Sequence, residues 1–120
     1  MQLFAEARTK ILKLPSAERA VVPERKIVDY LLSDTHPRGR SKAVFFRGLG
    51  FFRDDPERLR AALVEIAVST DMMESAFAFG TKYVGIGDIV APNGNRARVT
   101  TVWVIRETGA PPVFVTAYPG

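Results

Sequence analysis

The side chain best suited to proton transfer in this sequence is His36, the only histidine among the 120 residues. It precedes Pro37 in a segment that interrupts a helical pattern. Residues 35–53 contain five basic residues and no acid: Arg38, Arg40, Lys42, Arg47 and Arg53. A histidine in such a cationic loop can exchange protons with a phosphodiester while its neighbours stabilise the charge of the transition state. The alternative interpretation is a turn histidine beside solvated surface charges.

A second candidate patch comes from two predicted strands in the last quarter of the chain. If Arg106 pairs with Val113, alternation places four apolar residues on one face and four polar or aromatic residues on the other. The second set is Thr101, Trp103, Thr116 and Tyr118. Its hydroxyls can bind phosphate oxygens and its rings can stack on bases, although Trp103 also suits the core. Arg96 and Arg98 alternate with Ala97 in a predicted basic edge strand, which either contacts phosphate or prevents unwanted strand pairing.

The first half of the chain predicts helices that position the histidine loop. Pro23 suits a helix start, and paired apolar residues at i,i+4 spacing continue that helix to about residue 33. Ser41 is the expected N-cap of a second helix. Asp55-Pro56-Glu57 predicts the start of a third, amphipathic helix. Asp71 is expected to begin one more short helical piece ending at Gly80, whereas the pattern of residues 3–14 fits a helix or an arm.

The second half predicts strands at residues 82–91, 96–106 and 113–118. The Asn93-Gly94 pair between the first two is a hairpin signal, because both residues tolerate positive φ. The resulting expectation is one α+β domain over residues 1–120, with N-terminal helices packed on a C-terminal antiparallel sheet of three to four strands.

Composition narrows the chemistry further. Without cysteine, and with one histidine, the sequence predicts no metal site, no cofactor and no thiol nucleophile. Gly85-Ile86-Gly87 is not a dinucleotide fingerprint, because no helix follows it. Seventeen Lys and Arg against 13 Asp and Glu favour an anionic partner. No stretch predicts a signal peptide or a membrane span, so we expect a cytoplasmic protein; a toxin module cut from a larger secreted chain would look the same.

Two sets of motifs resemble a family of small bacterial domains, and the members of that family look like toxin-type ribonucleases of the barnase, colicin and RelE-like superfamily. The first is Asp29-Tyr30-Leu31-Leu32, then His36-Pro37-x-Gly39-x-x-Lys42-Ala43-x-Phe45-Phe46, then Leu49-Gly50-Phe51. The second is Arg98-x-x-Thr101-Val102-Trp103 and Val115-Thr116-Ala117-Tyr118-Pro119. The resemblance spans about residues 15–119. It implies helices packed on an antiparallel sheet, with the active site on the exposed face of that sheet.

Position by position, the resemblance marks His36, Gly39, Lys42, Thr101, Trp103, Thr116 and Tyr118. Ile86 departs from it, because a polar or acidic residue is expected in that strand. We therefore predict a metal-independent toxin-type ribonuclease with an acidic antitoxin or immunity protein as partner. In this hypothesis His36 is the general acid or base, and Lys42 and Arg38 stabilise phosphate charge. Thr116 and Tyr118 complete the catalytic set by positioning the substrate. The remaining candidates bind the RNA: Arg40, Arg98, Thr101 and Trp103.

The alternative is a non-catalytic basic module that docks RNA or a partner protein. It explains the charge, a histidine that only serves a turn, and the lack of an acidic catalytic partner. The two hypotheses differ in whether His36 and Tyr118 face a shared open groove.

Overall fold

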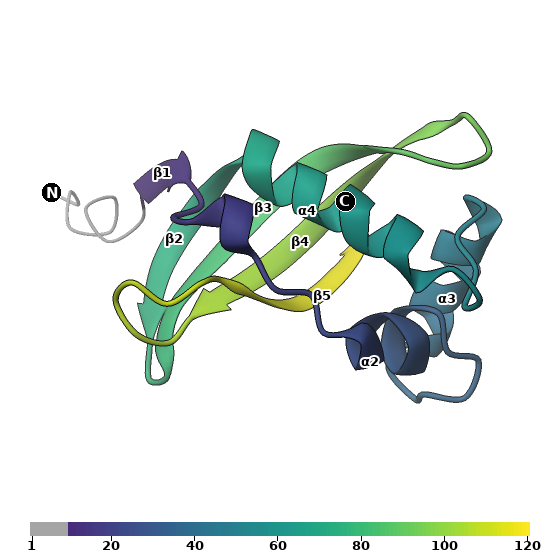
Figure 1. The fold of residues 1–120 in the computed structure, drawn as a ribbon, viewed down its shortest axis with the longest axis horizontal. Coiled ribbons are helices and arrows are strands. Elements are labelled where there is room, and N and C mark those ends of the chain that lie inside the picture. The colour runs from purple at the N-terminus through teal and green to yellow at the C-terminus, as the bar shows by residue number, and fades with distance from the viewer. Residues whose placement is uncertain (1–9) are drawn as a thin grey trace, which may run out of the picture.

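The structure, a computed structural model, describes residues 10–120 and shows an α+β fold built on one antiparallel sheet (Figure 1). Within these residues the sheet has five strands, which lie side by side in chain order: β1 (Lys10–Lys13), β2 (Asp71–Phe77), β3 (Gly80–Val90), β4 (Arg96–Ile105) and β5 (Val113–Pro119). The helical segments all fall between β1 and β2. They are η1 (Ala17–Arg19), α2 (Glu24–Lys26), the π-helical turn η2 (Ile27–Leu31), α3 (Arg40–Gly48) and α4 (Pro56–Ser69).

The predicted arrangement of helices followed by a three- to four-stranded sheet is wrong in two places, although the fold is α+β. β1 precedes the helices and forms one edge of the sheet. The stretch from Asp71, expected to be helical, is β2, which pairs with both β1 and β3. Met72 is buried whereas Met73 is half exposed, and this period of two is a strand pattern. Asp71 could cap a helix, but hydrogen bonding to strands on both sides stabilises this segment as a strand.

The three predicted helix starts lie close to the observed ones. Pro23 immediately precedes α2, and η2 continues the same helical segment to Leu31. Ser41 is the second residue of α3 and not its N-cap. Asp55 occupies the N-cap position of α4, with Pro56 as its first residue, as predicted.

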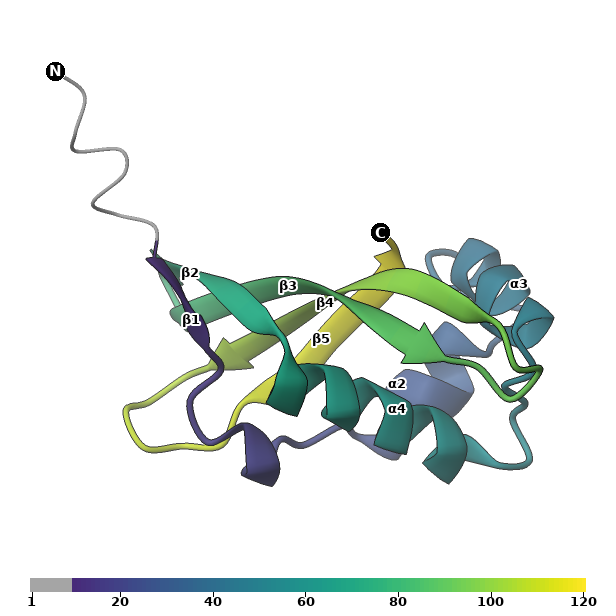
Figure 2. The same cartoon turned by 90° about the horizontal axis from the view of Figure 1, so that it is seen from above.

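α4 covers one face of the sheet (Figure 2). It buries a stripe of four apolar residues: Leu59, Leu63, Ile66 and Ala67. Gly87 permits close packing, because a Cβ there would lie 2.9 Å from a methyl carbon of Ile66. Burial of each large aliphatic side chain stabilises the fold by roughly 1.5–3 kcal/mol. This contact therefore fixes which face of the sheet becomes the core.

The opposite face carries none of the described helices (Figure 2). Strand pairing defines a row of side chains that crosses this open face through all five strands: Ile11, Met73, Val84, Val102 and Thr116. The neighbouring row consists of Ile86, Thr100 and Tyr118.

The register between β4 and β5 differs from the predicted one. Trp103 pairs with Phe114 and Val102 with Thr116, so Val115 is an extra residue that forms a bulge. Because a shift of one residue reverses the faces, Thr101 and Trp103 point into the core while Thr116 and Tyr118 lie on the open face. The predicted four-residue patch is therefore wrong.

Candidate functional site

Tyr30 is the centre of the most concentrated polar cluster near the predicted site residues. Its hydroxyl lies 2.8 Å from Oγ1 of Thr116, which joins η2 to β5. The ammonium groups of Lys26 and Lys42 lie 5.3 Å and 5.5 Å from the centre of its ring. The imidazole of His36 packs edge-on against the same ring, with 5.0 Å between centroids. We call these five residues the Tyr30 cluster.

Both lysines of the cluster are held by backbone carbonyl groups. The ammonium of Lys26 donates to the carbonyl of Val115, the bulged residue, at 3.0 Å. The ammonium of Lys42 donates to the carbonyl of Arg38 at 3.2 Å. An ammonium has three N–H groups, so each lysine keeps donors for a ligand. Cation–π attraction to Tyr30 also favours these positions.

His36 has a structural role in the turn that leads into α3. Its Nδ1 accepts hydrogen bonds from the backbone N–H groups of Arg38 at 3.0 Å and Gly39 at 3.1 Å. These are the contacts that an N-cap side chain makes. Because Nδ1 is the acceptor, the neutral ring carries its proton on Nε2. Nε2 is therefore a donor in this geometry, and a proton on Nδ1 would require the turn to open.

Gly39 allows the histidine turn to lie against η2. A Cβ at this position would be only 2.1 Å from the backbone oxygen of Tyr30. On the other side of the turn, Asp34 forms an ion pair with Arg47 of α3. These contacts hold His36 and Lys42 next to the Tyr30 ring.

A cavity of about 550 Å³ opens beside the cluster. Its lining comes from α2, η2, the histidine turn and β5: Arg25, Lys26, Asp29, Tyr30, His36, Arg38, Val115 and Thr116. Three of these side chains are cations and one, Asp29, is a carboxylate, so the cavity favours an anion. A volume of this size accommodates a ligand of roughly nucleotide dimensions.

The structure brings together four of the predicted site residues: His36, Arg38, Lys42 and Thr116. Tyr118 lies on the same sheet face as Thr116, about 7 Å further along the strand, because two residues of strand span that distance. Arg98 is exposed on this face too, opposite Asp88. Arg40 is exposed at the start of α3 and does not line the cavity. His36 and Tyr118 therefore do not line one common cavity.

Thr101 and Trp103 are not accessible to a substrate, which corrects their predicted binding role. Both have no exposed surface, and the indole N–H of Trp103 donates to Oγ1 of Thr101 at 2.9 Å. The indole also packs edge-on against Phe114, with 5.4 Å between centroids. The pair thus satisfies its polar atoms within the core, as buried polar groups require. The interpretation of Trp103 as a core residue is confirmed.

The sequence analysis missed Tyr30 and Lys26 as site residues. Their i,i+4 spacing places them on one side of a helical segment, which was a usable signal. Their contact with β5 could not be predicted from the sequence, because Tyr30 and Thr116 are 86 residues apart.

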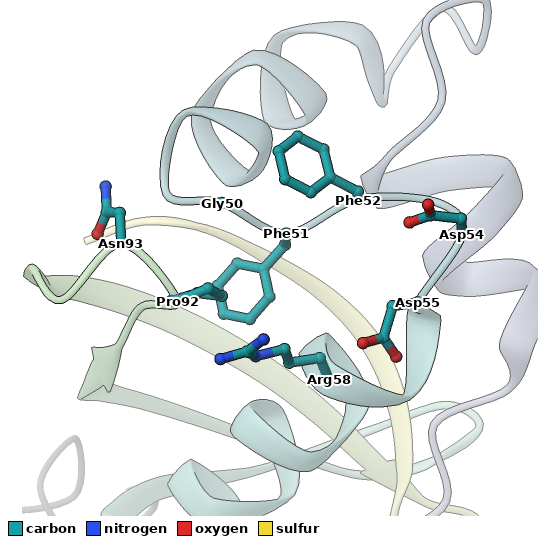
Figure 3. Close-up of a pocket in the computed structure, with 8 residues that line it drawn as sticks. All are labelled: Gly50, Phe51, Phe52, Asp54, Asp55, Arg58, Pro92 and Asn93. Carbon is teal, nitrogen blue, oxygen red and sulfur yellow. The ribbon is translucent and has the colours of Figure 1, made fainter.

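A second cavity, of about 610 Å³, lies between the loop after α3 and the β3–β4 hairpin. In Figure 3, Phe52 and the carboxylates of Asp54 and Asp55 lie on one side, and Pro92 and Asn93 on the other. Asn93 fixes the hairpin to α3 by donating from its backbone to Leu49 at 3.2 Å. None of the predicted site residues lines this cavity, and its carboxylates make it less suited to phosphate than the cavity at Tyr30.

Tyr83 is the one described residue whose pKa clearly departs from its ordinary value. Burial, followed by its hydrogen bond of 2.7 Å to Glu74, raises the pKa of Tyr83 to about 12. It lies on the core face of β3, opposite Trp103, and so stabilises the sheet without joining the Tyr30 cluster.

Two general features of residues 10–120 complete the description. They contain no group of three or more histidine, aspartate or glutamate side chains arranged to hold a metal ion. No helix in the same range is long and apolar enough to cross a membrane.

Fold and site together define a small α+β domain with a cationic, hydroxyl-bearing cavity at the β5 edge of its sheet. The sequence of residues 13–120 matches the family described as a domain of unknown function, DUF6883, and the chain belongs to that family. No curated protein matches it in sequence. Its fold is similar to that of one chain of the contact-dependent growth inhibition toxin–immunity protein complex from Klebsiella pneumoniae 342. The TM-score is 0.66 at 15% identity, over 83% of this chain and 99% of that one.

Proposed function

We propose that this domain is a toxin-type protein that binds RNA and cleaves it without a metal, and that the Tyr30 cluster binds the scissile phosphate. The observation that carries the proposal is the grouping of cations around Tyr30. The ammonium groups of Lys26 and Lys42 lie 5.3 Å and 5.5 Å from the centre of its ring, its hydroxyl contacts that of Thr116, and Arg38 lines the adjoining cavity. Fixed cations and hydroxyls are the groups that stabilise the charge of a phosphodiester transition state. The similar fold of a chain from a toxin–immunity complex supports the toxin part of the proposal.

We assign each residue of the site a role in this reaction. Lys42 and Arg38 stabilise phosphate charge, and Tyr30 and Thr116 orient the phosphate by hydrogen bonds. His36 contributes the N–H of Nε2 as a donor, because its Nδ1 is engaged by the turn. Asp29 is the one carboxylate lining the cavity and is the group placed to accept the proton of the attacking 2′-hydroxyl. The new bond joins that oxygen to phosphorus, the bond to the 5′-oxygen breaks, and a lysine ammonium of the cluster supplies the proton that this oxygen takes up.

An acidic antitoxin or immunity protein is the partner we propose for such a toxin. The protein carries a formal net charge of +4, so a negatively charged partner would be attracted to the surface that RNA uses. Tyr118 and Arg98, on the sheet face that borders the cluster, are the proposed further contacts for RNA.

Two observations favour the second candidate, a non-catalytic RNA-binding module. His36 and Tyr118 do not line one common cavity, and the hydrogen bonds that Nδ1 of His36 accepts give the histidine a complete role in the turn. A matched pair of variants separates the two functions. His36→Asn keeps a side-chain acceptor for the turn but removes the imidazole, whereas His36→Ala removes both.

The experiment is expression in bacteria from a tightly repressed promoter, together with incubation of purified protein and RNA in the presence of a chelator. A ribonuclease should arrest growth and cleave RNA despite the chelator, and both effects should be lost in Asp29→Asn and strongly reduced in His36→Asn. Intact RNA and normal growth with the wild-type protein, combined with RNA binding that survives in His36→Asn, would instead establish the binding module.

A further inference from the structure

The open face of the sheet is apolar where a solvated face should be polar. An antiparallel sheet with one face in water normally alternates between apolar residues inside and polar residues outside. On this face, however, the exposed side chains include Ile11, Met73 and Ile86, and the half-buried Val84 and Val102 lie beside them. A contiguous apolar surface of this kind marks an interaction site.

Two opposite charges flank the apolar centre along β3. Lys82 and Asp88 are exposed on the open face, with Val84 and Ile86 between them on the same side of the strand. Neither Lys82 nor Asp88 forms an ion pair with another residue in the described range of the chain. The order along β3 is therefore cation, apolar, apolar, anion, and Arg98 of β4 lies opposite Asp88 on the same face.

This order is complementary to itself under a two-fold rotation. Suppose that two copies stack face to face, with their β3 strands antiparallel and the two-fold axis passing beside Gly85. Each residue of β3 then faces the residue of the other copy that lies equally far from Gly85 on its other side. Lys82 of one copy then meets Asp88 of the other, twice, and Val84 meets Ile86, twice. A two-fold interface requires such self-complementarity.

We propose that the open face is a homodimer interface, in which two copies of this chain stack their sheets about a two-fold axis beside Gly85. Five strands about 4.8 Å apart and seven residues of about 3.3 Å each give a face of roughly 550 Å² per copy, or about 1,100 Å² in total. This total lies just above the roughly 1,000 Å² expected of a specific interface, so the dimer is weak and depends on concentration. Tyr118 and Arg98 share this face, so the dimer and the RNA contacts proposed for these two residues exclude one another.

The test is sedimentation equilibrium of the full chain from about 10 µM to about 1 mM, the range in which a weak dimer dissociates. The wild-type protein should show a reversible monomer–dimer equilibrium. Ile86→Lys should weaken the dimer at least about tenfold, since it places two unpaired charges in the apolar centre. Val68→Lys, at an exposed position on α4, is the matched control and should not change the equilibrium.

Charge reversal tests the axis itself and does not require a substitution in the apolar centre. Lys82→Asp and Asp88→Lys should each weaken the dimer, because each places like charges opposite one another. A mixture of these two variants should form a heterodimer, and the double variant should dimerise again. A wild-type protein that stays monomeric across the range overturns the proposal, as does a dimer that is indifferent to Ile86→Lys or to the charge reversals.

Discussion

The hydroxyl of Tyr30 lies 2.8 Å from Oγ1 of Thr116, although 86 positions separate the two residues in sequence. This contact ties η2 to the edge strand β5 and aligns the cations of the Tyr30 cluster with the open face of the sheet. It is both a tertiary link and part of the proposed phosphate site. Its energetic and functional contributions are therefore separable by experiment.

Tyr30→Phe keeps the ring beside the two lysines and removes only the hydroxyl. We expect it to lower the free energy of unfolding by about 1 kcal/mol, the typical net value of one hydrogen bond. Thr116→Val should have a similar effect, and the double variant should lose less than the sum, because the same bond is removed in each. Urea unfolding of the four proteins measures this coupling. Strictly additive losses would show that the two hydroxyls do not interact.

RNA binding should depend on salt through the cations of the histidine turn. On a log–log plot, affinity for single-stranded RNA falls with a slope of about −0.7 per phosphate neutralised. Arg38→Gln combined with Lys42→Gln should therefore flatten the slope by about 1.4. Arg58→Gln, which removes a charge beside the other cavity, should leave the slope unchanged and serves as the control. A slope that responds equally to both changes would indicate only a general charge effect.

Gly39→Ala should destabilise the protein by about 2 kcal/mol, because the new methyl group would collide with the backbone oxygen of Tyr30. Gly48→Ala provides the contrast within α3. A Cβ at Gly48 has no atom within 4 Å, and alanine should there raise helix stability by up to about 1 kcal/mol. Thermal unfolding distinguishes the two. Equal stability of both variants would mean that the histidine turn does not lie against η2 as described.

The stability of the fold should decrease at high pH through Tyr83. Its pKa of about 12 exceeds the ordinary value of 10.0, so the folded protein holds this proton more tightly than the unfolded chain does. The resulting stabilisation is present in full below about pH 10 and is lost as the pH rises toward 12; two pKa units correspond to about 2.7 kcal/mol. Urea midpoints measured between pH 9 and 12 for the wild-type protein and Tyr83→Phe test this. The variant should lack that part of the decline, and identical pH profiles would contradict the prediction.

The sequence by itself determined the local elements near the candidate site. Asp55-Pro56-Glu57 predicted the start of α4, and the Asn93-Gly94 pair predicted the β3–β4 hairpin, because capping and turn geometry depend on neighbouring residues only. The basic stretch after His36 likewise pointed to the turn that carries His36 and to the start of α3, which carries Lys42. These signals needed no knowledge of the rest of the chain.

Only the tertiary structure decided which residues face the site. β2 was mistaken for a helix because its stability comes from β1 and β3, which lie far from it or follow it in sequence. One extra residue in β5, Val115, placed Thr116 and Tyr118 on the face opposite to that of Thr101 and Trp103, since a bulge reverses the alternation of side chains. Tyr30 became the centre of the cluster through contacts with His36, Lys42 and Thr116, and long-range packing of this kind leaves no periodic trace in a sequence.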